Sequence, residues 1–169
     1  MEHIVIIGNG IAGVTAARHI RKLSDKKITI VSAESEYFFS RTALMYVYMG
    51  HMKFEHTQPY ENHFWKKNRI DLVNAYVTKV NTQEKLLHLD GAPDLNYDKL
   101  IIATGSKPNK FGWPGQDLEG VQGLYSKQDL ERVEELANTT KEAVVVDGGL
   151  IGIELVEMLL TRGIKVSFL

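Results

Sequence analysis

The sequence predicts an α/β protein that combines a parallel sheet with an antiparallel β-meander and then begins a second α/β domain. The first observation is that residues 4–7 form a wholly apolar, β-branched run that ends in a glycine-rich turn. Such a run is typical of a buried parallel strand, and helical spacing of apolar residues follows the turn. The second observation is that residues 147–152 repeat this layout. The third is a further apolar strand at 28–31, which completes a βαβ unit with an expected right-handed crossover.

The middle of the chain has shorter predicted elements. Residues 37–49 are expected to be helical after Ser40, and residues 58–67 to form a second helical stretch. Strand-like runs separated by turn-forming residues follow at 70–73, 75–80, 85–89 and 100–103. Repeated strands and turns after a βαβ unit indicate an antiparallel meander attached to the parallel sheet.

The last third of the chain is interpreted as a crossing followed by a new α/β unit. Three of the four prolines lie between Pro93 and Pro114, in a stretch also rich in glycine, which is typical of irregular structure. Ser126 is expected to cap a helix, with Asp129 in the capping-box position. A strand at 143–146, a helix over 151–159 with Gly163 as its C-terminal cap, and a strand from 165 are then expected. The predicted divisions are 1–108 for a first domain, 109–125 for the crossing and 126–169 for the start of a second domain, inside which the chain stops.

The composition excludes several classes of function. With 20 basic and 21 acidic side chains in 169 residues the net charge is −1, which argues against a nucleic acid or an anionic membrane as partner. No apolar run approaches a membrane span and no signal peptide precedes the first strand, so we expect a cytoplasmic protein. The absence of cysteine excludes disulfides, thiolate metal sites and thiol nucleophiles.

The turn at residues 8–13 has the spacing of a dinucleotide-binding loop. Three glycines would permit a tight turn, close approach of the backbone to a pyrophosphate at the helix N-terminus, and close helix–strand contact. Glu34 lies 21 residues beyond the last glycine, where a carboxylate can accept hydrogen bonds from ribose hydroxyls. The alternatives are a turn that binds no phosphate, and a solvated surface acid at position 34. The hexapeptide comprises Gly8, Asn9, Gly10, Ile11, Ala12 and Gly13.

The second glycine motif repeats the first at a constant offset of 139 residues, from Gly10 to Gly149 and from Gly13 to Gly152. Two nucleotide-binding folds in one chain indicate electron transfer between two nucleotides. Asp147 stands where the first glycine is expected, and like charges about 4 Å apart repel by roughly 4 kcal/mol at an effective dielectric constant near 20. We therefore expect weakened dinucleotide binding at this second motif.

These features together resemble the FAD-dependent pyridine nucleotide-disulfide oxidoreductase family. The resemblance rests on the two glycine motifs and on residues 100–108, 114–121 and 144–154, so it spans essentially the whole chain. It implies a Rossmann-like FAD/NAD(P)-binding fold with FAD and NAD(P)H as cofactors. The implied FAD contacts are Gly8, Gly10, Ile11, Ala12 and Gly13 at the pyrophosphate, Glu34 at the ribose, Val77 at adenine through its backbone, and Thr104 and Gly105 beside the flavin. The implied NAD(P)H contacts are Gly149, Ile151 and Gly152, with Glu154 near the nicotinamide.

Residues 40–44 narrow the resemblance within the family. Relatives that act through a cysteine carry it in this region, whereas this segment resembles the branch of rubredoxin, ferredoxin and nitrite reductase flavoproteins. Arg41 is implied to contact FAD, although a surface arginine packed on an aromatic ring is the alternative. Glu154 likewise could be an acid that complements the helix dipole.

The implied function is hydride transfer from NAD(P)H to FAD and onward to a non-thiol acceptor, such as a small redox protein, a haem or nitrite site, or a small molecule. The alternative is an inert nucleotide-binding fragment of such an enzyme. No side chain is assigned as a catalytic acid, base or nucleophile. No metal site is expected, since only His51 and His56 share a loop with a carboxylate, Glu55. The sequence leaves open the oligomeric state, the acceptor, and the choice between NADH and NADPH.

Overall fold

The computed structural model describes residues 1–169, which form two compact units that we treat separately. The first unit comprises Met1–Phe39 and Gln58–Ser106, and the second comprises Ser40–Thr57 and Lys107–Leu169. The second unit thus takes in residues 40–57, which the sequence-based division counts with the first domain. That division, into 1–108, 109–125 and 126–169, stays a prediction about nucleotide-binding domains.

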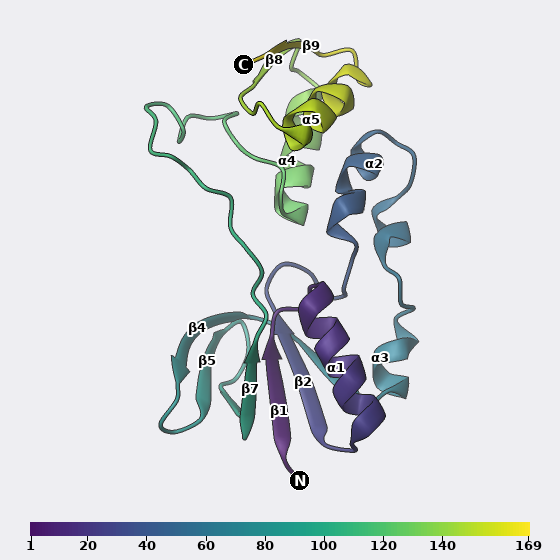
Figure 1. The fold of residues 1–169 in the computed structure, drawn as a ribbon, viewed down its shortest axis with the longest axis vertical. Coiled ribbons are helices and arrows are strands. Elements are labelled where there is room, and N and C mark those ends of the chain that lie inside the picture. Colours follow the sequence, from purple (N-terminus) through teal and green to yellow (C-terminus); the bar gives the residue numbers. More distant parts are fainter. The chain divides into compact units, whose positions relative to one another are not determined.

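The first unit is built on a four-stranded parallel sheet in the order β3-β2-β1-β7 (Figure 1). These strands are β1 (His3–Ile7), β2 (Lys27–Ser32), β3 (Ile70–Asn74) and β7 (Lys99–Ile102). Helix α1 (Ile11–Leu23) connects β1 to β2, as the sequence predicts. Strand β1 lies at the centre, with Ile4 opposite Ile28 of β2 on one side and opposite Lys99 of β7 on the other.

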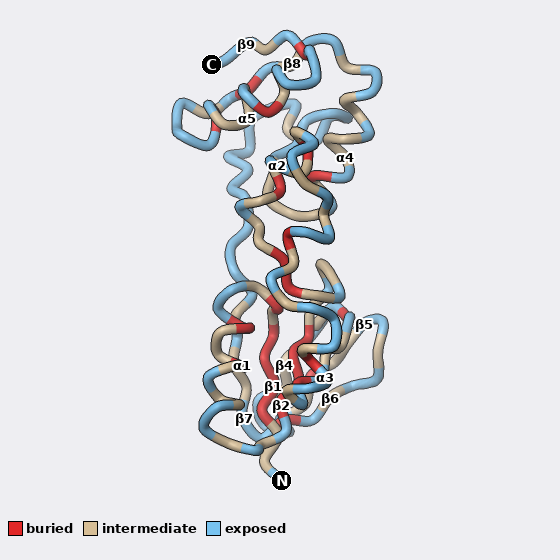
Figure 2. Tube along the Cα trace, turned by 90° about the vertical axis from the view of Figure 1, so that its right-hand side faces the viewer, coloured by how far each residue is buried: buried red, intermediate tan, exposed pale blue.

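Both faces of this sheet are covered, which explains the continuous apolar run of β1. Ile4 and Ile6 pack against α1 and against α3 (His63–Lys67), whereas Val5 and Ile7 pack against the meander. Val5 and Ile6 are both fully buried, and buried residues run along the central strands in Figure 2. A strand covered on both sides has no polar face, so the alternation of polar and apolar residues disappears.

The meander is the antiparallel sheet expected from the sequence, although its membership differs from the expectation. It consists of β4 (Tyr76–Asn81), β5 (Leu86–Asp90) and β6 (Leu95–Asn96). The predicted strands at 70–73 and 100–103 join the parallel sheet instead, as β3 and β7. The predicted helix over 58–67 is shorter, since it begins only after Asn62. Pro59 accounts for the non-helical backbone of Gln58.

The second unit pairs two parallel strands with helices. Its elements are η1 (Arg41–Ala43), α2 (Leu44–Tyr48), η2 (Phe54–Thr57), α4 (Lys127–Ala137), β8 (Glu142–Val145), α5 (Leu150–Leu160) and β9 (Lys165–Phe168). Helix α5 connects β8 to β9, and α2 packs against α4 and α5. The capping box at Ser126 and Asp129 is confirmed, and Gly163 follows α5 with a φ of +72°. No helix of the chain is long and apolar enough to cross a membrane.

Candidate functional site

The turn between β1 and α1 lies at the carboxyl edge of the parallel sheet. Gly8 has a φ of +108°, in the region that favours glycine, and its N–H donates to the carbonyl of Val31 at 2.8 Å. A Cβ at Gly8 would lie 2.2 Å from the carbonyl oxygen of Ala103, just after β7. The first glycine is therefore required by the neighbouring strand as well as by its own backbone angle.

The other two glycines of this turn differ in what surrounds them. A Cβ at Gly13 would lie 2.0 Å from the carbonyl oxygen of Gly8, so the helix and the turn touch through backbone. A Cβ at Gly10 would meet nothing within 4 Å, and no side chain caps the helix at this N-cap residue. Ile11 and Ala12 are exposed, Ile11 by 71%. The N-terminal amides of α1 thus face open space, which fits a phosphate group of a dinucleotide.

Asn9 connects this turn to the loop that carries Glu34. It is only 7% exposed, its Nδ2 donates to the carbonyl of Ser35 at 2.8 Å, and its Oδ1 accepts from the Ser32 hydroxyl at 2.9 Å. Half-buried Glu34 lies between these two anchored residues. The sequence analysis assigned no role to Asn9; a short amide side chain between two glycines is the signal that could have indicated one.

The remaining predicted FAD contacts of this unit lie around the same edge of the sheet. The N–H of Ala103 donates to the carbonyl of Ile7 at 2.8 Å, so Thr104 and Gly105 leave the sheet beside the glycine turn. The start of β4 is held near the end of β2, since Ala75 donates to the carbonyl of Ser32 at 3.1 Å. The side chain of Val77 packs against the apolar cluster between the parallel sheet and the meander, and Val77 pairs with Leu89 of β5.

The second glycine turn, in the second unit, reproduces part of this geometry. Gly149 is the N-cap of α5 in an extended conformation, with φ −100° and ψ −176°, close to the −71° and −177° of Gly10. A Cβ at Gly152 would lie 2.1 Å from the carbonyl oxygen of Asp147, as at Gly13. The difference is the carboxylate of Asp147, whose Oδ1 accepts the N–H of Gly149 at 2.9 Å.

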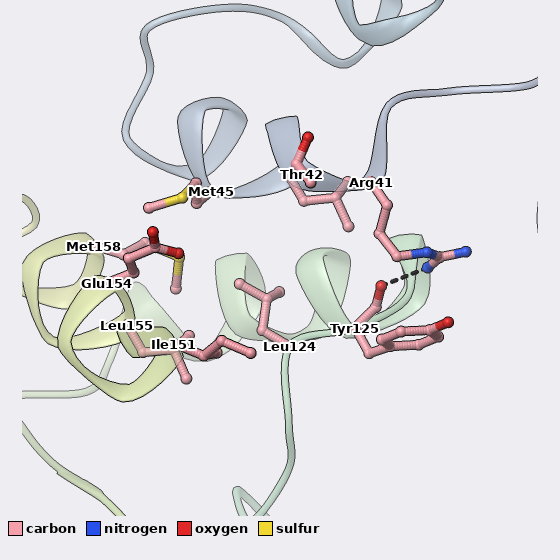
Figure 3. Close-up of a pocket in the computed structure, with 10 residues that line it drawn as sticks. Arg41, Thr42, Met45, Leu124, Tyr125, Ile151, Glu154, Leu155 and Met158 are labelled. Atoms are coloured by element: carbon pink, nitrogen blue, oxygen red, sulfur yellow. Dashed lines mark hydrogen bonds between the residues drawn. The ribbon is translucent and has the colours of Figure 1, made fainter. Parts of the chain in front are cut away.

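A cavity of about 140 Å³ lies within the second unit, between η1, α2 and α5 (Figure 3). Arg41 and Glu154 both line it and stand at different ends. Met45 and Met158 lie beside Glu154, and Leu124 lies between the two ends. Arg41 Nη1 donates to the carbonyl of Tyr125 at 2.5 Å, and its guanidinium lies 4.3 Å from the centre of the Tyr125 ring. The cavity is therefore lined by a guanidinium group that Tyr125 holds in place, by a carboxylate and by apolar side chains.

Helix α2, which forms one wall of the cavity, is held by Arg162. Its Nη2 donates to the carbonyl of Tyr48 at 2.8 Å, and its guanidinium lies 4.0 Å from the centre of the Tyr48 ring. Tyr48 is 1% exposed, and burial raises the pKa of its hydroxyl. The sequence analysis named neither Tyr48, Tyr125 nor Arg162, because contacts across more than 80 residues leave no local pattern.

The comparisons with known proteins identify the family of the chain. The family described as "Pyridine nucleotide-disulphide oxidoreductase" matches residues 2–169. The chain belongs to this family. Homologues in the family bind FAD and NAD(P)H, as the sequence analysis expected of the cofactors.

Two relatives illustrate the range of the family. Nitrite reductase [NAD(P)H] of Bacillus subtilis is 33% identical over 98% of this chain and 21% of its own length. NADH-rubredoxin oxidoreductase of Clostridium acetobutylicum is 28% identical over 97% of this chain and 43% of its own length. The chain thus spans less than half the length of either relative.

Solved structures confirm the predicted Rossmann-like fold class. The crystal structure of the Clostridium acetobutylicum NADH:rubredoxin oxidoreductase superposes with a TM-score of 0.84 at 28% identity, over 98% of this chain and 43% of the other. A NAD-dependent persulfide reductase from A. fulgidus gives a TM-score of 0.88 at 31% identity, over 98% of this chain and 33% of the other.

Proposed function

We propose that this chain is the cofactor-binding part of a flavoprotein oxidoreductase that transfers a hydride from NAD(P)H to FAD and passes the electrons to a non-thiol acceptor. The observation that carries the proposal is the open first turn, in which Gly10 leaves the N-terminus of α1 accessible. The absence of cysteine supports an acceptor that is reached without a protein thiol.

The first unit would hold FAD through its backbone. Gly8, Gly10 and Gly13, with Ile11 and Ala12, present helix N–H groups to the pyrophosphate, and Glu34 accepts hydrogen bonds from the ribose. Asn9 keeps the Glu34 loop beside the turn before the ligand arrives. Val77, Thr104 and Gly105 complete the contacts. When bound, FAD would supply the redox chemistry, since it can accept a hydride and release electrons, and we assign no side chain as acid, base or nucleophile.

The second unit would hold the nicotinamide nucleotide. Gly149, Ile151 and Gly152 form the turn that meets the pyrophosphate, and Glu154 and Arg41 stand at different ends of the apolar cavity. We assign Glu154 to the nicotinamide end and Arg41 to FAD. The apolar side chains around these two groups would strengthen the electrostatic interactions that Glu154 and Arg41 make with a bound ligand.

The acceptor is proposed from the relatives. The names of three curated relatives refer to nitrite, rubredoxin and ferredoxin and to no thiol, whereas one similar solved structure is named as a persulfide reductase. A small redox protein, a haem or nitrite site, or a small molecule would take the electrons. The cytoplasm, where NAD(P)H is available, is the proposed setting. Residues 1–108 are the proposed FAD domain, 109–125 the crossing, and 126–169 the start of the NAD(P) domain.

A second candidate function is FAD binding without reduction by NAD(P)H. The observation that favours it is the hydrogen bond that the Gly149 N–H donates to Asp147, because a backbone donor of the second turn is then already occupied by a side chain of the chain itself.

One experiment separates the two candidates. The purified chain, supplied with FAD and freed of excess, is expected to keep a flavin spectrum that NADH or NADPH bleaches without oxygen. A flavin spectrum that neither nucleotide bleaches would support only the second candidate.

A variant tests the FAD site itself. Gly10→Val should abolish flavin retention while leaving the fold intact. Gly123→Val is the matched control, since Gly123 also has nothing within 4 Å of its Cβ position and an ordinary φ. Flavin retention by Gly10→Val would contradict the proposed site.

A further inference from the structure

Asp147 places a carboxylate inside the second glycine turn. Its Oδ1 accepts the N–H of Gly149 at 2.9 Å. Gly149 is the N-cap of α5, so this N–H lies at the positive end of an 11-residue helix. Backbone N–H groups at this place are those that phosphate oxygens use in such turns. An anion supplied by the chain itself thus takes the hydrogen bond that a pyrophosphate would need.

The first turn has no counterpart to this carboxylate. Gly8 stands at the equivalent position, and the Cβ position of Gly10 meets nothing within 4 Å. The same space at Gly149 is occupied, since a Cβ there would lie 3.1 Å from Oδ1 of Asp147. One turn is therefore open to a dianionic group, and the other already contains a negative charge.

The rest of the second turn keeps its nucleotide-binding form. The N-cap residues of α1 and α5 share an extended conformation, and Gly152 keeps the close backbone contact seen at Gly13. Asp147 itself has no positive φ, since Arg69 and Lys85 are the only non-glycine residues with one. The substitution therefore leaves the helix docked and changes the charge at the phosphate position.

We propose that Asp147 competes with the pyrophosphate of NAD(P)H for the Gly149 N–H, and so selects against anionic dinucleotides at the second site. This inference rests on the proposed function, which places the nicotinamide nucleotide there. A dihydronicotinamide without phosphates has no group that meets the carboxylate. The site thus distinguishes the two reductants by charge.

The test measures dissociation constants of the full chain for NADH and for N-benzyl-1,4-dihydronicotinamide, a phosphate-free reductant. Asp147→Gly removes both the charge and the acceptor, and NADH should bind about tenfold tighter or more, which corresponds to about 1.4 kcal/mol. Asp147→Asn keeps an acceptor without the charge, and should give a smaller gain. Neither variant should change the affinity for the benzyl compound. Asp117→Asn, which removes an exposed carboxylate elsewhere in the same unit, should leave both constants unchanged.

Two results would overturn the inference. One is equal, measurable NADH binding by the parent chain and Asp147→Gly, which rejects the role of Asp147 and leaves the proposed function standing. The other is an equal gain for both reductants, which shows a general opening of the site rather than competition for phosphate. If no variant binds NADH although the chain binds FAD, the nicotinamide part of the proposed function fails as well.

Discussion

The two glycine turns have the same spacing and different surroundings, and the comparison separates the roles of their glycines. In both turns a Cβ on the third glycine would touch backbone, at 2.0 Å from the Gly8 carbonyl oxygen and 2.1 Å from that of Asp147, so its role is to dock the helix. The first glycine differs. Gly8 is confined by the carbonyl of Ala103 after β7, whereas β8 pairs with β9 alone in the described chain, and Asp147 meets no third strand. A glycine is required where a neighbouring strand approaches the turn.

The largest expected effect is at the third glycine of each turn. Gly13→Ala and Gly152→Ala should each destabilise their unit by roughly 3 kcal/mol, because the new methyl group would overlap a backbone carbonyl that cannot move without shifting the helix. Urea unfolding, followed by circular dichroism, measures the change. Gly123→Ala is the control and should leave the unfolding midpoint almost unchanged. A large cost at Gly13 with none at Gly152 would show that the two turns do not share this contact.

A more discriminating effect is expected at the first position. Gly8→Ala should also cost roughly 3 kcal/mol, since it combines a φ of +108° with the approach of the Ala103 carbonyl. Asp147→Ala should cost only about 1 kcal/mol, because it removes a side-chain acceptor at the N-terminus of α5 and relieves no backbone strain. The same urea experiment compares them. Equal costs for Gly8→Ala and Asp147→Ala would contradict the inference that the approach of a neighbouring strand makes a glycine necessary at the first position.

The smallest effect concerns acid sensitivity, which we expect in the first unit through His3 of β1. Burial, and then the charge of Lys27, lower the pKa of His3 below its ordinary 6.5, and its Nε2 lies 2.8 Å from the Thr29 hydroxyl. Because the folded pKa is depressed, the unfolded chain binds more protons. Stability is therefore fully present above pH 6.5 and is lost as the pH falls through the folded pKa.

His3→Gln tests this sign. When the pH falls from 7.5 to 5.5, the urea concentration at the unfolding midpoint should decrease more for the parent chain than for the variant. An equal loss in both would assign the acid sensitivity to other groups.

The sequence predicted those features that have a local pattern. The apolar run of β1, the glycine turns and the capping box at Ser126 and Asp129 each depend on neighbours within a few residues, and each is confirmed. Strand β6 was missed because two residues carry no periodicity.

The missed features of the candidate site are long-range or depend on side-chain rotamers. Arg41 meets the Tyr125 carbonyl across 84 residues, so no spacing rule could connect them. The sequence shows that Asp147 puts a negative charge where a glycine is expected. The hydrogen bond that it accepts from Gly149 depends on a side-chain torsion that the sequence does not show. Which residues bind the cofactors stays a prediction until ligand binding is measured.

The central place of β1 in its sheet has a consequence for how the chain is made. Ile4 pairs with Lys99, so one edge of the strand has no partner until about a hundred residues have left the ribosome. During that interval a strand that is wholly apolar over residues 4–7 presents free backbone groups, which is the usual starting point for aggregation. Synthesis speed and chaperone access over this stretch should therefore affect the yield of folded protein more than the final stability does.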